Sequence, residues 1–105
     1  VTAHMGNSMY GATKAAVCAM TKGLAVELAA RNIRVNAILP GMVDTPMNQT
    51  ENITEEQLEE DKRRYPLKRY ARPDEIAYAA IYFLSDASTF TTGASLIVDG
   101  GFTLL

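Results

Sequence analysis

The sequence predicts an α/β fold in which helices alternate with two short parallel strands. Three observations support this prediction: an alanine-rich helical pattern at 8–31, a β-branched run at 33–39 that Pro40 and Gly41 end, and a short apolar run at 95–98 followed by an Asp-Gly-Gly turn. Two further helical patterns lie between the two runs. The connection is therefore long enough for a right-handed crossover, which joins parallel strands.

The first predicted helix covers residues 8–31, and residues 1–7 are predicted to form a loop. Asn7 or Ser8 can cap the helix, alanine gives it high propensity, and Asn32 tolerates the left-handed conformation that closes many helices. Its wide apolar stripe predicts packing against more than one surface and comprises Ala16, Val17, Met20, Leu24, Ala25, Leu28 and Ala29.

The other two helices are predicted from their first turns. Thr54 and Gln57 have the spacing of a capping box, which opens a polar helix that ends near Arg64. A proline suits the first position of the next helix, 73–85, and acidic residues complete its first turn. The predicted buried side of that helix comprises Ile76, Ala80, Phe83 and Leu84.

Composition limits the classes of function. The 105 residues are 48% hydrophobic and 21% charged, with a formal net charge of −2, which is typical of one globular domain at most. This charge balance provides no excess of positive charge for binding nucleic acid or an anionic membrane. No apolar run approaches the ~20 residues that span a bilayer. The start, Val1-Thr2-Ala3-His4, lacks the features of a signal peptide. We therefore expect a cytoplasmic protein.

Cys18 and His4 are the only cysteine and histidine. One cysteine provides no disulfide framework and favours a reducing compartment, and the surroundings of Cys18 predict a small buried residue. One histidine argues against histidine-based triads and the usual zinc sites, so no metal site is predicted. Because Val1 is not an initiator methionine, we expect the chain to be a piece of a longer protein.

The pair of Tyr10 and Lys14 indicates a chemical function. Residues four apart on a helix share one face, with Cβ atoms roughly 5–6 Å apart. A phenol has an unperturbed pKa of ~10, and a neighbouring ammonium group lowers this pKa by favouring the phenolate. The pair is therefore a candidate tyrosine general acid/base, although such a pair taken alone more often reflects surface packing.

Five elements, in this order and spacing, resemble the C-terminal part of the short-chain dehydrogenase/reductase family. They are Tyr10-x-x-x-Lys14, the run Arg34-Val35-Asn36-Ala37-Ile38-Leu39-Pro40-Gly41, Thr45-Pro46-Met47, Arg72-Pro73-Asp74-Glu75-Ile76 and Val98-Asp99-Gly100-Gly101. The first element is weakly specific alone, but the five together are highly specific. The resemblance implies that residues 1–105 form the C-terminal portion of a doubly wound Rossmann-type parallel sheet, with the N-terminal half absent.

The resemblance also implies the chemistry. Tyr10 would protonate a carbonyl oxygen or take a proton from an alcohol, and Lys14 would lower the pKa of Tyr10 and bind the nicotinamide ribose. The substrates would be small carbonyl or alcohol compounds such as 3-oxoacyl thioesters, polyols or sugars. The cofactor would be NAD or NADP.

Four further residues would bind that cofactor if the resemblance holds. Pro40 and Gly41 would lie against the nicotinamide ring, Val43 would contact the carboxamide through its backbone, and the Thr45 hydroxyl would bond the amide or the pyrophosphate. The alternatives are a simple turn for Pro40 and Gly41 and a local cap for Thr45.

The same family likeness implies a lid and subunit contacts. Residues 46–66 would cover the substrate, with Met47 and Tyr65 lining the cleft, although plain packing is the commoner role of such side chains. The helix at 8–31, and the helix at 73–85 together with the strand at 95–98, would join subunits in a homo-oligomer, commonly a tetramer.

Two parts of the family pattern are missing from the sequence. No glycine-rich turn follows a strand, and the catalytic serine lies further upstream than the nine residues before Tyr10, with Ser8 too close to replace it. We therefore expect the chain to be inactive alone. The alternatives are a non-catalytic oligomerisation module and an NAD(P)-sensing regulator; the presence of both Tyr10 and Lys14 favours an active parent enzyme.

Overall fold

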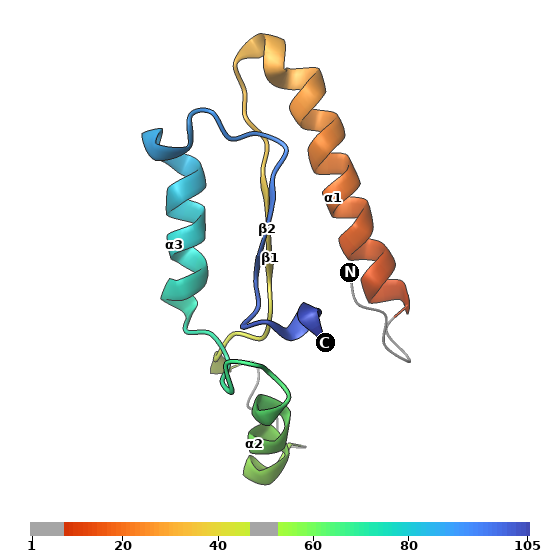
Figure 1. Cartoon of the computed structure of the whole chain (residues 1–105), viewed down its shortest axis with the longest axis vertical. Coiled ribbons are helices and arrows are strands. Elements are labelled where there is room, and N and C mark those ends of the chain that lie inside the picture. Colours follow the sequence, from red (N-terminus) through yellow and green to blue (C-terminus); the bar gives the residue numbers. More distant parts are fainter. Residues whose placement is uncertain (1–7, 47–52) are drawn as a thin grey trace.

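The computed structural model describes residues 8–46 and 53–105 (Figure 1). The predicted alternation of helices and strands is confirmed in these residues, whereas the loop predicted at 1–7 lies outside them. The regular elements are the helices α1 (Ser8–Leu28), α2 (Glu55–Arg63) and α3 (Pro73–Leu84) and the strands β1 (Ala37–Pro40) and β2 (Ser95–Val98).

The two strands are parallel, as predicted. Ala37 pairs with Ser95 and Pro40 pairs with Val98, so the strands run in full register over their whole length. Helix α1 contacts β1, α3 contacts both strands, and the two helices flank the strand pair from different sides (Figure 1). This arrangement is the α/β fold that the sequence predicts.

Helix α1 ends as its sequence predicts. The residues Ala29–Arg31 tighten into a 3₁₀ turn, and Asn32 takes the left-handed conformation with φ 58° while its N–H donates to the Ala29 carbonyl at 2.9 Å. The predicted apolar stripe is only partly covered, because Ala25 is buried while Val17, Met20 and Leu24 are exposed. Cys18, predicted to be buried, is half-buried.

Strand β1 begins later than the predicted residue 33. The residues before it bind the last turn of α3 and the loop that follows. The Arg34 guanidinium donates to the Phe83 carbonyl at 2.8 Å and to the Thr91 carbonyl at 3.2 Å. Asn36 donates to the Thr91 carbonyl and accepts from the Ala94 N–H, each at 3.0 Å. Residues 33–36, which were predicted to belong to the strand, are thus bound through side chains and lie before the strand ladder begins.

The starts of α2 and α3 follow the predicted capping chemistry. Thr54 accepts from the Gln57 N–H at 3.2 Å, and the Gln57 side chain accepts from the Thr54 N–H at 3.0 Å, which completes the capping box. Pro73 is the first residue of α3.

The prediction that Leu84 lies on the buried side of α3 is wrong, because this residue is 86% exposed. Consecutive residues differ by about 100° around a helix, so Leu84 turns away from the face that Phe83 occupies. Phe83 is half-buried in the helix that contacts both strands, and its carbonyl accepts from Arg34 and from the Ser88 hydroxyl.

The described chain has an open shape. Its radius of gyration is 16.0 Å, against about 13 Å for a compact domain of this length. The buried apolar side chains of the described part are few, namely Ala25, Ala37, Tyr65 and Tyr70. Two of these four lie beyond the carboxyl ends of the strands, where the candidate site is found.

Candidate functional site

The predicted catalytic pair belongs to the first turns of α1. Tyr10 and Lys14 both fall within this helix, and Lys14 is half-buried; the side chain of Tyr10 lies outside the described residues. The N-terminal end of α1 and the carboxyl end of β1 lie at the same end of the molecule (Figure 1). The helix therefore begins near the strand end that is followed by the predicted cofactor-binding residues.

Pro40 and Gly41 close β1 at that end. The Gly41 N–H continues the strand ladder by donating to the Val98 carbonyl at 2.9 Å. A Cβ atom on Gly41 would lie 2.9 Å from the Cα atom and 3.0 Å from the Cβ atom of Asp99. Glycine is therefore required here because the two strand ends approach each other closely.

The next residues form an extended segment that pairs with the loop before α3. Val43 forms a parallel bridge with Ala71: the Asp44 N–H donates to the Ala71 carbonyl at 2.8 Å, and the Ala71 N–H donates to the Met42 carbonyl at 3.0 Å. Because successive residues of extended backbone point their polar groups to opposite sides, the N–H and C=O of Val43 point away from Ala71. Thr45 follows and is half-buried.

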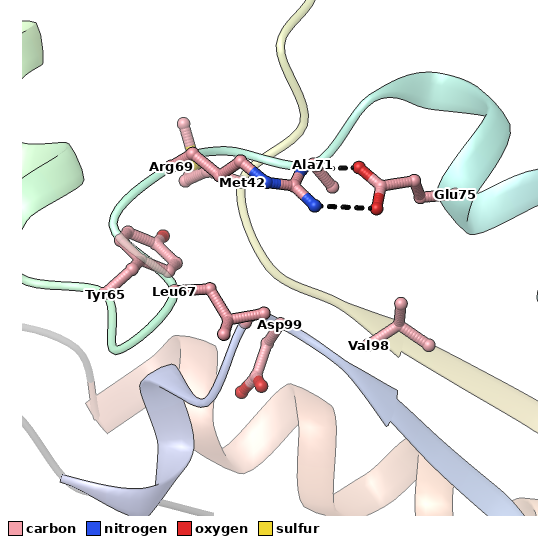
Figure 2. A pocket seen from close by; sticks show the side chains of 9 residues that line it. Met42, Tyr65, Leu67, Arg69, Ala71, Glu75, Val98 and Asp99 are labelled. Carbon is pink, nitrogen blue, oxygen red and sulfur yellow. Dashed lines mark hydrogen bonds and ion pairs between the residues drawn. The ribbon is translucent and has the colours of Figure 1, made fainter.

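A small cleft of about 100 Å³ opens beside this segment (Figure 2). Its lining combines apolar side chains, including those of Met42, Tyr65 and Val98, with the charged side chains of Arg69, Glu75 and Asp99. Tyr65 therefore lines a cleft, although it is 5% exposed and chiefly a packing residue. Met47, the other predicted lining residue, lies outside the described part of the chain.

Arg69 and Glu75 form the most ordered charged pair of the cleft. The guanidinium donates from Nη1 to Oε1 at 2.6 Å and from Nη2 to Oε2 at 2.9 Å, as the dashed lines in Figure 2 mark. The bonds from Arg69, together with one from the Arg72 N–H at 2.9 Å, lower the pKa of Glu75 to about 2. Glu75 is therefore an anion at neutral pH and holds Arg69 in place.

Asp99 organises the turn that follows β2. Its carboxylate accepts from the Gly101 N–H and from the Thr103 N–H, each at 2.9 Å. Burial alone would raise the pKa of Asp99, but the hydrogen bonds from Thr103 and Gly101 outweigh it and lower the pKa. The ionised carboxylate therefore acts as a cap for the chain after the strand.

Two buried tyrosines near the cleft are poor candidates for proton transfer. Burial raises the pKa of Tyr65, and burial together with the hydrogen bond that its hydroxyl donates to Asp61 raises the pKa of Tyr70. A general acid/base works best when its pKa is near the operating pH, so a raised pKa makes both tyrosines less suited to that role.

The sequence did not point to the Arg69–Glu75 pair or to Tyr70. Arg69 and Glu75 are six residues apart across a loop, so no helical or strand spacing relates them. In the sequence, Glu75 is an acidic residue in the first turn of a predicted helix and part of the Arg72-Pro73-Asp74-Glu75-Ile76 element. Neither feature relates it to Arg69, and its N3 position after Arg72 is the usual place of a capping glutamate.

Two classes of site are not found in the residues that the structure describes. Within 8–46 and 53–105, no group of three or more His, Cys, Asp or Glu side chains could hold a metal ion. None of the helices in these ranges is both long and apolar enough to cross a bilayer.

Comparison with known proteins places this geometry in a family. The family described as Enoyl-(Acyl carrier protein) reductase matches residues 1–103. The 3-oxoacyl-(acyl-carrier-protein) reductase FabG of Thermotoga maritima is 46% identical over 96 residues, which are 91% of this chain and 38% of the relative. Glucose 1-dehydrogenase 2 of Bacillus subtilis is 39% identical over 98 residues, covering 93% of this chain and 38% of the relative.

A solved structure gives the same result for the fold. The short chain dehydrogenase family protein of Francisella tularensis superposes with a TM-score of 0.84 at 38% identity, over 98% of this chain and 46% of that one. The chain thus spans less than half the length of the proteins that it matches, and its two strands are part of a Rossmann fold. The chain belongs to the short-chain dehydrogenase/reductase family and corresponds to the C-terminal part of its members.

Proposed function

We propose that this chain supplies the proton-transfer residues and the nicotinamide-side wall of an NAD(P)-dependent oxidoreductase that interconverts a ketone and a secondary alcohol. The observation that carries the proposal is the placement of Tyr10 and Lys14 in the first turns of α1, in a chain of this family. When bound, the cofactor supplies or accepts the hydride. The chain's own residues exchange the proton and hold the reactants.

Tyr10 is the proposed acid/base and Lys14 its electrostatic partner. The two residues are one helical turn apart, so their side chains leave the same face of α1. Lowering a phenol pKa by roughly three requires about 4 kcal/mol of differential interaction, which a positive charge supplies only in a partly desolvated setting. The half-buried environment of Lys14 is consistent with such a setting.

Pro40, Gly41, Val43 and Thr45 are the proposed binding residues for NAD or NADP. The donor set fits a carboxamide, because an amide offers both a donor and an acceptor and extended backbone presents the same two groups. The bonds of the neighbouring residues to Ala71 direct the backbone groups of Val43 to the other side of the segment. The carboxyl end of a parallel strand is also where ligands bind in open α/β sheets.

A chimera tests the proposal. Residues 1–105 replace the matching part of the Thermotoga maritima reductase, and reduction of a 3-oxoacyl thioester and of a sugar ketone is measured with NADH and NADPH. Loss of a general acid/base costs about 100- to 10,000-fold in rate, so we expect Tyr10→Phe to reduce kcat by that factor. Phe90→Ala, which removes a fully exposed ring outside the proposed site and the proposed subunit contacts, is the control and should leave kcat unchanged.

The outcomes separate this proposal from a regulator that only senses NAD(P). Retained turnover in the Tyr10→Phe chimera would overturn the assignment of Tyr10. A chimera that binds NADPH with its native sequence but reduces neither substrate would favour the sensor. The 105-residue chain by itself is proposed to be inactive, since it spans 38% of the relative's length.

The exposed apolar residues support an assembly role beside the catalytic one. On α3, Tyr78, Ile81 and Leu84 are exposed, and on β2 Leu96 and Ile97 are exposed. Large contiguous apolar patches are rarely left in water on a monomer. We propose that the helix at 73–85 with the strand at 95–98, and the helix at 8–31, join subunits of a homo-oligomer, in line with a tetramer.

Two finer assignments also stay proposals. Residues 46–66 are proposed to cover the substrate, and α2 is the part of that segment with regular structure. A cytoplasmic location is proposed because the chain has one cysteine, as is common in a reducing compartment.

A further inference from the structure

An aromatic cluster joins three separate parts of the chain. Tyr65 and Tyr70 meet edge to face with ring centroids 5.7 Å apart, and Tyr65 also packs on Phe102 with centroids 4.8 Å apart. Tyr65 and Tyr70 are 5% and 6% exposed, whereas most large apolar side chains of the described residues are open to water. The cluster is therefore a principal buried centre at this end of the molecule.

The last turns of α2 hold this cluster from one side. The Asp61 carboxylate accepts a hydrogen bond from the Tyr70 hydroxyl. It also forms an ion pair with Arg64, in which Nη1 lies 3.3 Å from Oδ1. The Lys62 ammonium lies 5.5 Å from the centre of the Tyr70 ring, and the Arg64 guanidinium lies 5.7 Å from the centre of the Phe102 ring. Cations over aromatic faces are attracted by the ring quadrupole.

The turn after β2 holds the cluster from the other side. The Leu67 N–H donates to the Gly100 carbonyl at 3.1 Å, and Gly100 lies against the side chains of Tyr65 and Leu67. The same turn is capped by Asp99, whose Cα atom lies closest to the position that a Cβ atom on Gly41 would take. One short turn thus contacts both the end of β1 and the base of α2.

We propose that Asp61, Tyr65, Tyr70 and Phe102 form a clasp that fastens the C-terminal end of α2 to the turn after β2. The hydrogen bond from the Tyr70 hydroxyl to the Asp61 carboxylate joins the cluster to α2. The contact of the Phe102 ring with Tyr65 joins the cluster to the turn after β2. These four residues act as positioning residues that hold α2 in place.

Hydrogen–deuterium exchange of the 105-residue chain tests the clasp. The reporters for α2 are the Arg64 and Tyr65 amides, which follow the helix directly and donate to the carbonyls of Asp61 and Lys62 in its last turn. The reference is the Ala37 amide in the sheet. Loss of one hydrogen bond corresponds to roughly fivefold, so Tyr70→Phe should speed exchange of the α2 reporters about fivefold without changing the reference. Tyr78→Phe is the matched control and should change neither.

A second substitution tests the anchor to the turn. Phe102→Ala should speed exchange of the α2 reporters and of the Leu67 amide, whereas Phe90→Ala, which removes a fully exposed ring, should not. Equal α2 exchange in Tyr70→Phe and Tyr78→Phe would overturn the clasp. So would α2 amides that already exchange freely in the native sequence. The measurement requires no cofactor or substrate, so its result is independent of the redox function.

Discussion

The guanidinium of Arg69 faces the carboxylate of Glu75 in a bidentate pair, with N–O distances of 2.6 and 2.9 Å. This pair ties the loop after α2 to the first turn of α3 and forms one wall of the cleft (Figure 2). Planar two-point contacts of this kind fix orientation as well as charge. The position of the loop therefore depends on Glu75 being ionised.

The first prediction concerns the dependence of this pair on pH. The pKa of Glu75 is lowered to about 2 in the folded chain, chiefly by Arg69, from an ordinary value of 4.5. A depressed carboxyl pKa stabilises the folded state above the unfolded pKa, and this stability is lost as the pH falls toward 2. We expect Glu75→Gln to lower Tm by a few degrees at pH 7.

The Tm difference between the native sequence and Glu75→Gln should shrink from about pH 5 downward. Glu59→Gln is the control, because Glu59 forms an exposed pair with Lys62 at 3.5 Å. Such surface pairs contribute little to stability. A Tm difference that stays constant between pH 7 and pH 2 would contradict the role given to Glu75.

The second prediction concerns the close approach at Gly41. In Gly41→Ala the new methyl group meets the Cα atom of Asp99 at 2.9 Å, so the two strand ends must separate. Forced packing of this kind costs roughly 1–3 kcal/mol, which urea unfolding would measure. Gly23→Ala is the matched control: it lies in α1 with nothing within 4 Å of the added atom. It should raise stability by about 0.5–1 kcal/mol.

The third prediction concerns Asn36. Its side chain bonds the Thr91 carbonyl and the Ala94 N–H, each at 3.0 Å, and so holds the loop before β2 against the start of β1. Asn36→Ala leaves both backbone groups without this partner and should reduce the free energy of unfolding by roughly 1–3 kcal/mol. Asn32→Gly keeps the left-handed backbone and should change it by less than about 0.5 kcal/mol. Equal effects of the two substitutions would refute this assignment.

The fourth prediction concerns the start of α2. Thr54→Ala removes the side-chain acceptor of the capping box and should cost about 1 kcal/mol. The loss should appear as faster amide exchange at Gln57 and Leu58, measured by NMR. Thr54→Ser retains the hydroxyl and should exchange at the native rate. Unchanged exchange in Thr54→Ala would show that the cap does not hold the helix.

Much of the fold could be predicted because it depends on local chemistry. Asn32, the Thr54 capping box and Pro73 mark helix ends through bonds and backbone angles within a few residues. The parallel pairing followed from the long connection between two short apolar runs. The helix ends are therefore set by neighbouring residues, and the strand direction by the length of the connection.

What could not be predicted depends on contacts between distant residues. Leu84 fits the apolar pattern of α3, but only the position of the strands decides which side of that helix is covered. Tyr65 meets Phe102, and Arg34 meets Phe83, through folding that no local spacing reveals. Tyr10 and Lys14 were candidates already from their helical spacing, whereas the other four predicted site residues came from family likeness. The roles of all six remain predictions.

The pairing of β1 with β2 also has a consequence for biosynthesis. Ala37 pairs with Ser95, so this strand pair cannot form until Ser95–Val98 have left the ribosome. Closing so long a loop costs roughly 3–4 kcal/mol of chain entropy before any contact between the two strands is made. The pairing of β1 with β2 should therefore form late, after the helices α1, α2 and α3 have been synthesised.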